Sequence, residues 1–101
     1  MQRFIAVFVA FVCLLGCSSA PVQEMSDARQ AIAAARVAGA SEGSSAELYA
    51  AEAAIARAEK HIDAQEYTRA RLAAMEAKHH AGEARSAAEH AEVRHSETPP
   101  P

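Results

Sequence analysis

The sequence predicts an all-α fold, in which an antiparallel helical hairpin and a third, N-terminal helix form a small three-helix bundle. Two observations predict it. Alanine, the residue with the highest helix propensity, provides 25 of the 85 residues from 17 to 101. Apolar positions there also recur at alternating spacings of three and four, which is the periodicity of one helix face. Because only 12 of these residues are larger apolar ones and none is Phe or Trp, we expect a thin core.

The first helix of the bundle is expected over residues 21 to about 38. Pro21 suits the first position of a helix. The apolar positions of its inner face are Met25, Ala28, Ile32 and Ala35. Two glycines and two serines within residues 39–44 then predict a flexible turn.

A second helix is expected to begin at Ser44, because Ser44 and Glu47 have the spacing of a capping box. Its inner face is formed by Leu48, Ala51, Ile55, Ala58 and Ile62. The register of the apolar positions changes near residues 63–66, where we expect a tight connection although no Gly or Pro enforces it. The alternative is one continuous helix over residues 45–95.

The third helix carries the most regular pattern in the chain, a heptad stripe of nearly four repeats. The stripe consists of Tyr67, Ala70, Ala74, Ala77, Ala81, Ala84, Ala88 and Ala91. A 3.5-residue repeat keeps one stripe turned toward a neighbouring helix. If the chain's own helices leave the stripe unfilled, it is a candidate interaction seam for a helical partner or for self-association. The residues of this seam are Ala70, Ala74, Ala77, Ala81, Ala84 and Ala88.

Residues 1–16 have the layout of a secretory signal peptide. A basic residue, Arg3, precedes an apolar run over residues 4–15, and the small residue Gly16 follows. Twelve residues of helix rise only about 18 Å, whereas a bilayer core is roughly 30 Å thick. We therefore expect a signal helix and not a membrane span.

The apolar run ends in Leu14-Leu15-Gly16-Cys17, which resembles the lipobox of bacterial lipoproteins. The resemblance implies cleavage between Gly16 and Cys17, a thioether from the Cys17 sulfur to diacylglycerol, and acylation of the new amino terminus. The alternative is an ordinary secreted protein whose cleavage site happens to precede a cysteine. In lipoprotein sorting a serine after the cysteine, here Ser18, implies the outer membrane.

These patterns divide the chain into a signal peptide (residues 1–16), a lipidated tether (17–21), an alanine-rich helical domain (22–95) and a disordered, Pro-rich tail (96–101). Residues 17–101 carry nine Lys and Arg against 13 Asp and Glu, a formal charge of −4, with both signs interspersed. Such a surface has no electrostatic footprint for nucleic acid or for anionic lipid headgroups. We expect membrane contact through the lipid anchor and no nucleic-acid partner.

No residues suggest catalysis, and we expect no enzyme. Ser41, Ser44 and Ser45 lie in a predicted turn without a Gly-x-Ser-x-Gly elbow, and no glycine loop for phosphate is present. The lipid would occupy Cys17, the one cysteine left after cleavage. So thin a core also leaves too little volume for a ligand pocket of a few hundred Å³.

Histidines on the third helix are the one feature that suggests a metal site. Glu76 and His79 have the Glu-x-x-His spacing of di-metal helical bundles, but the heptad stripe places them on the outward face. We favour a solvated surface there, without a physiological metal or any cofactor apart from the lipid on Cys17. The candidates for weak Zn²⁺ or Cu²⁺ binding are Glu76, His79, His80 and Glu83.

Three motifs carry a family resemblance over most of the chain after the signal. They are Pro21…Ala28-x-x-x-Ile32-x-x-Ala35 with Gly39-Ala40, then Leu48-x-x-Ala51…Ala58, then Tyr67-x-x-Ala70-x-x-x-Ala74-x-x-Ala77. On these residues the chain resembles the domain-of-unknown-function 4398 family of small, alanine-rich bacterial envelope lipoproteins. The resemblance implies an envelope location and supplies no catalytic residues.

The chain is also similar to the helical murein lipoprotein, in which a terminal lysine is linked to peptidoglycan. Here three prolines, residues 99–101, take that place, so no covalent peptidoglycan link is expected. The expectation is a lipid-anchored envelope protein that faces the periplasm and acts as a structural or protein-interaction module. The alternative is a periplasmic metal-binding or stress-related lipoprotein that uses the His/Glu face of the third helix.

Overall fold

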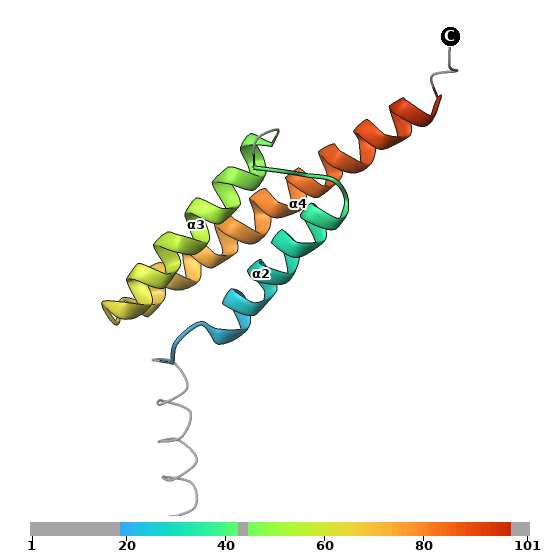
Figure 1. Cartoon of the computed structure of the whole chain (residues 1–101). Coiled ribbons are helices and arrows are strands. Elements are labelled where there is room, and N and C mark those ends of the chain that lie inside the picture. Colours follow the sequence, from blue (N-terminus) through green and yellow to red (C-terminus); the bar gives the residue numbers. More distant parts are fainter. Residues whose placement is uncertain (1–18, 43–44, 98–101) are drawn as a thin grey trace, which may run out of the picture.

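The structure, a computed structural model, describes residues 19–42 and 45–97, and these residues form three helices without any strand (Figure 1). The helices are α2 (Val22–Val37), α3 (Ala46–Asp63) and α4 (Tyr67–Glu97). The all-α prediction is confirmed for this part of the chain. The predicted signal helix, the cleavage site at Gly16 and Cys17, and residues 98–101 of the predicted tail lie outside the described residues. Ser96 and Glu97 are helical, whereas the sequence predicted that the tail begins there.

Helix α2 ends in a Schellman motif that depends on Gly39. The N–H of Ala40 donates to the carbonyl of Ala35, and the N–H of Gly39 donates to that of Arg36, both at 3.0 Å. Gly39 has a φ of 109°, a backbone conformation that residues with a Cβ rarely adopt. The motif turns the chain back, and the side chain of Ala40 joins Ala35 in the core.

The N-cap of α3 is Ser45, so the predicted capping box of Ser44 and Glu47 is wrong. The Ser45 side chain accepts a hydrogen bond from the backbone N–H of Leu48 at 3.1 Å. Ser44 itself lies outside the described residues. The third residue after Ser45 is Leu48, which has no carboxylate or amide to complete a capping box. Glu47 is instead a first-turn residue, and its carboxylate can contact α4.

A tight connection joins α3 to α4 at the predicted place, which excludes the single continuous helix. Gln65 has a φ of 60°, in the left-handed region where Gly is the usual residue. Its N–H donates to the carbonyl of Ile62 at 2.9 Å, and the N–H of Glu66 donates to that of His61 at 2.8 Å. These two bonds are again those of a Schellman motif, here built without glycine.

Helix α4 is the common element of the bundle. It packs against both α3 and α2, whereas α2 and α3 share a smaller contact. Because α4 has 31 residues and α3 has 18, the C-terminal end of α4 projects beyond the other two helices (Figure 1).

The core is made mostly of alanine, and Leu48 and Pro21 are the largest fully buried side chains. Ala54 is fully buried, whereas Ile55 and Ile62, which the sequence placed on the inner face of α3, are only partly buried. The buried residues from the three helices are Met25, Ala28, Ile32, Ala35, Leu48, Ala51, Ala54, Ala58, Ala70, Ala73, Ala74, Ala77, Ala81 and Ala84. Alanine contacts of this kind bring helix axes close together but bury little apolar area per residue.

Candidate functional site

One group of three potential metal ligands lies among residues 19–42 and 45–97, between α3 and α4. It consists of Glu47 from α3 and of His80 and Glu83 from α4. One possible ligand atom from each residue lies within 4.8 Å of those of the other two. The group therefore combines one imidazole and two carboxylates from two different helices.

The antiparallel hairpin explains why these residues meet. Glu47 lies in the first turn of α3, and the hairpin places this turn beside the middle of α4. His80 and Glu83 are three residues apart and share one face of α4. Glu47 also benefits from the partial positive charge at the N-terminus of α3.

The imidazole of His80 lies between two carboxylates. Its Nδ1 is 2.7 Å from Oε2 of Glu47, and its Nε2 is 3.7 Å from Oε1 of Glu76, one turn earlier on α4. The guanidinium of Arg57 donates to both oxygens of Glu76, at 3.1 and 3.3 Å. Glu76 is thus already held by a bidentate pair that ties α3 to α4.

Electrostatics in this cluster favour the charged carboxylates. Hydrogen bonding to His80, followed by a smaller contribution from Glu83, lowers the pKa of Glu47. The hydrogen bonds from Arg57 lower the pKa of Glu76. Both carboxylates are therefore ionised over the whole neutral range.

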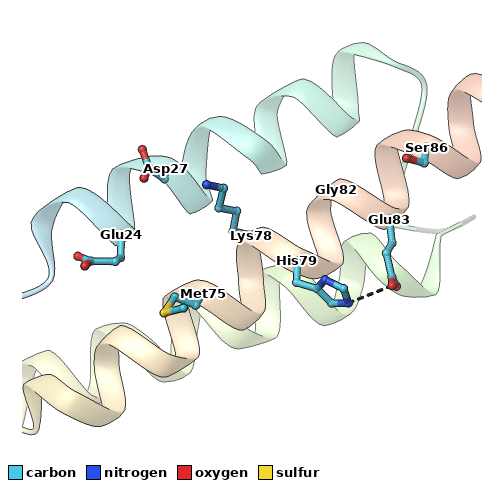
Figure 2. A pocket seen from close by; sticks show the side chains of 8 residues that line it. All are labelled: Glu24, Asp27, Met75, Lys78, His79, Gly82, Glu83 and Ser86. Atoms are coloured by element: carbon cyan, nitrogen blue, oxygen red, sulfur yellow. Dashed lines mark ion pairs between the residues drawn. The ribbon is translucent and has the colours of Figure 1, made fainter.

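The four metal candidates of the sequence do not share one outward face. The side chains of Glu76, His79 and Glu83 are 45, 69 and 50% exposed, but Glu76 binds Arg57 of α3 and Glu83 lies near Glu47 of α3. His80 turns toward α3 and is only 27% exposed. His79 pairs with Glu83 through Nε2 and Oε1 at 3.0 Å (Figure 2).

Sequence reasoning missed Glu47, which it assigned to a capping box. The available signal was the predicted turn, because residues at similar distances from a hairpin turn lie opposite one another on the two helices. Glu47 and His80 are nearly equidistant from Ala64 and Gln65. A helix-by-helix search cannot find such a pair, since it compares only neighbours along the chain.

The alanine seam proposed for a partner lies inside the bundle. Ala70, Ala74, Ala77, Ala81 and Ala84 are at most 1% exposed, because α2 and α3 cover them. Beyond the ends of these helices, Ala88 is only partly buried. The seam from 70 to 84 therefore holds this chain's own helices together and is not an open surface for a partner.

An open groove of about 850 Å³ runs between α2 and α4 (Figure 2). The expectation that so thin a core leaves too little volume for a pocket is wrong, because this groove is open to the surface and does not lie within the core. Gly82 leaves open space where a side chain would stand. The lining residues are Glu24, Asp27, Met75, Lys78, His79, Gly82, Glu83 and Ser86.

The residues that follow Cys17 are fixed to the bundle from Ser19 onward. Arg71 donates through Nη2 to the carbonyl of Ser19 at 3.4 Å and forms an ion pair with Glu24 at 3.2 Å. The ring of Pro21 is fully buried. None of the described helices combines the length and the apolar character needed to cross a membrane.

Comparisons with known proteins add no relative to these observations: no family model, no curated protein and no solved structure matches the chain.

Proposed function

We propose that this chain is a lipid-anchored protein of the bacterial cell envelope, which acts in the periplasm as a structural or protein-interaction module. The observation that carries the proposal is Leu14-Leu15-Gly16-Cys17 at the end of a short apolar run. In this proposal Cys17 carries the diacylglycerol and an acyl chain on its amino group. Two or more chains make a stable anchor, whereas a single chain binds a membrane only marginally.

The short path from Cys17 to the bundle supports a role close to the membrane surface. Ser19 is already bound to Arg71, so only one residue, Ser18, separates Cys17 from the folded part. Two steps of the chain, from Cys17 to Ser19, span at most about 7 Å. Val22, at the start of α2, lines a shared hollow with Asp63 at the end of α3. The α3–α4 turn and the projecting end of α4 lie at opposite ends of the bundle (Figure 1). In this proposal the α3–α4 turn lies toward the lipid and the projecting end lies away from it.

An interaction module fits the side chains better than an enzyme does. The surface offers an open groove between α2 and α4, and two large apolar side chains of α4, Leu72 and Met75, are 63 and 55% exposed. The resemblance to small alanine-rich envelope lipoproteins points to the same location. Outer-membrane placement follows from Ser18 in the same proposal.

Replacement of Cys17 by alanine tests the anchor. We expect the Cys17→Ala variant to incorporate no labelled palmitate and to leave the membrane fraction, or to stay unprocessed. Cys13→Ala is the matched control, because Cys13 lies in the segment that cleavage removes, and this variant should be labelled and fractionate like the original chain. A Cys17→Ala protein that is cleaved and still sediments with membranes would refute the proposal.

A further inference from the structure

We infer that Glu47, His80 and Glu83 form a binding site for one divalent transition-metal ion, best matched by Zn²⁺, which joins α3 to α4. The inference rests on these three side chains and does not depend on the lipid anchor. It differs from the weak surface site considered for α4 alone, because one ligand comes from the other helix of the hairpin.

The donor set favours a transition metal over the hard cations. Zn²⁺ binds imidazole nitrogen and carboxylate oxygen at about 2.0–2.2 Å, usually with four ligands. The three side chains would supply one nitrogen and two oxygens, and solvent would supply the fourth ligand. Mg²⁺ and Ca²⁺ require six or more oxygen ligands, so two carboxylates and an imidazole suit them poorly.

The distances require only a small movement of side chains. Ligand atoms around a tetrahedral Zn²⁺ are about 3.4 Å apart for bonds of this length, and here they lie within 4.8 Å of one another. The side chains of Glu47 and Glu83 are 42 and 50% exposed, so they can rotate without disturbing the core. His80 is the most buried of the three and already contacts Glu47.

The charges around the site leave a place for a cation. Glu47 pairs with His80 and Glu83 pairs with His79, and no lysine or arginine within residues 19–42 and 45–97 forms an ion pair with either carboxylate. Arg57, the α3 cation that reaches this part of α4, pairs with Glu76. A neutral imidazole brings no charge, so a divalent ion would balance both carboxylates and use the form of His80 that binds metals.

A bound ion would have a structural consequence. Its ligands belong to two helices that are held together mainly by alanine contacts, which bury little apolar area. An ion that binds only the folded hairpin raises the free energy of unfolding in proportion to the logarithm of its concentration over Kd. The metal would thus strengthen a bundle whose own core is thin.

The test is Zn²⁺ titration of the full chain in detergent micelles, purified without a polyhistidine tag. Cys13 and Cys17 are replaced by serine so that no thiol competes. Calorimetry should give one ion per chain, and circular dichroism at 222 nm should show a Tm higher by on the order of 10 °C at 100 times Kd. An equal rise in Tm with Mg²⁺ or Ca²⁺ would overturn the assignment to a transition metal.

Paired variants test whether the ion joins the two helices. Glu47→Gln should weaken Zn²⁺ binding at least about tenfold and abolish the rise in Tm, while Glu59→Gln, an exposed change on the same helix, should do neither. His80→Gln should likewise lose binding, and His90→Gln should retain it. If Glu47→Gln binds Zn²⁺ as well as the original chain, or if the controls lose binding equally, the inference is wrong. The metal-free Tm of each variant shows that it folds.

Discussion

Ala77→Leu is the sharpest test of the alanine core. Ala77 is fully buried where the three helices meet, in contact with Ala28 of α2 and Ala54 of α3. Leucine adds three carbon atoms at a point where α2 and α3 each bring a buried alanine close to α4 and where Ile55 also packs. Because leucine is itself a good helix former, any loss of stability comes from packing and not from helix propensity.

The expected cost follows from this geometry. Extra carbons in a packed core destabilise by about 1–3 kcal/mol, and alanine neighbours on both sides place Ala77→Leu toward the upper end. For a domain of this size each kcal/mol lowers Tm by roughly 4–8 °C. We therefore expect a Tm lower by about 10–20 °C, since 2–3 kcal/mol is the relevant range.

Thermal unfolding followed by circular dichroism at 222 nm measures this difference. The matched control is Ala91→Leu, which changes the same heptad stripe of α4 where it is exposed. This variant should remain within about 0.5 kcal/mol of the original chain. Equal effects at Ala77 and Ala91, or a higher Tm for Ala77→Leu, would refute the packing described for α4.

Three further predictions concern other parts of the bundle. Leu48→Ala should lower the free energy of unfolding by about 2–5 kcal/mol by opening a cavity, because Leu48 is the largest fully buried aliphatic side chain described. Chemical denaturation measures this loss, and a loss below about 1 kcal/mol would contradict the prediction. Ser45→Ala should lower the free energy of unfolding by about 1 kcal/mol and Ser45→Gly by a few tenths, both measured by Tm. An unchanged Tm for Ser45→Ala would show that the cap on α3 is unimportant. Arg57 lowers the pKa of Glu76 from its ordinary value of 4.5, so the stabilisation is present above that value and is lost as the pH falls below it. Since both side chains are about half exposed, only a few tenths of a kcal/mol is involved; Arg57→Gln should reduce the change in Tm between pH 7 and pH 3, and an unchanged difference would contradict the pair.

The turns show which helix ends short-range features of the sequence can predict. Gly39 was visible in the sequence, and it occupies the left-handed position that ends α2. Gln65 fills the equivalent position after α3 without being a glycine, so only the change of apolar register indicated that turn. The N-cap was misplaced by one residue, because Ser44 and Ser45 are both good caps and the Ser44–Glu47 spacing favoured the wrong one.

Two of the three residues of the candidate site could be predicted to lie together from the sequence, and the third could not. His80 and Glu83 share a face of α4, and their spacing along one helix shows this directly. Glu47 comes from the opposite helix, and its contact with His80 at 2.7 Å exists only once the hairpin has closed. Cys17 belongs to a local motif that the sequence displays in full, and its lipidation remains a prediction to be tested at that residue.

The sequence by itself predicted three helices with ends close to the observed ones, and most of the apolar positions on their inner faces. Propensity, end signals and periodicity act between residues a few positions apart, so they can be recognised without knowledge of the fold. Only the tertiary structure decided that Ala77 is buried while Ala91 on the same stripe is exposed. The physical reason is that burial requires a covering helix: α2 and α3 cover α4 only as far as they extend, and the same arrangement brings Glu47 to His80.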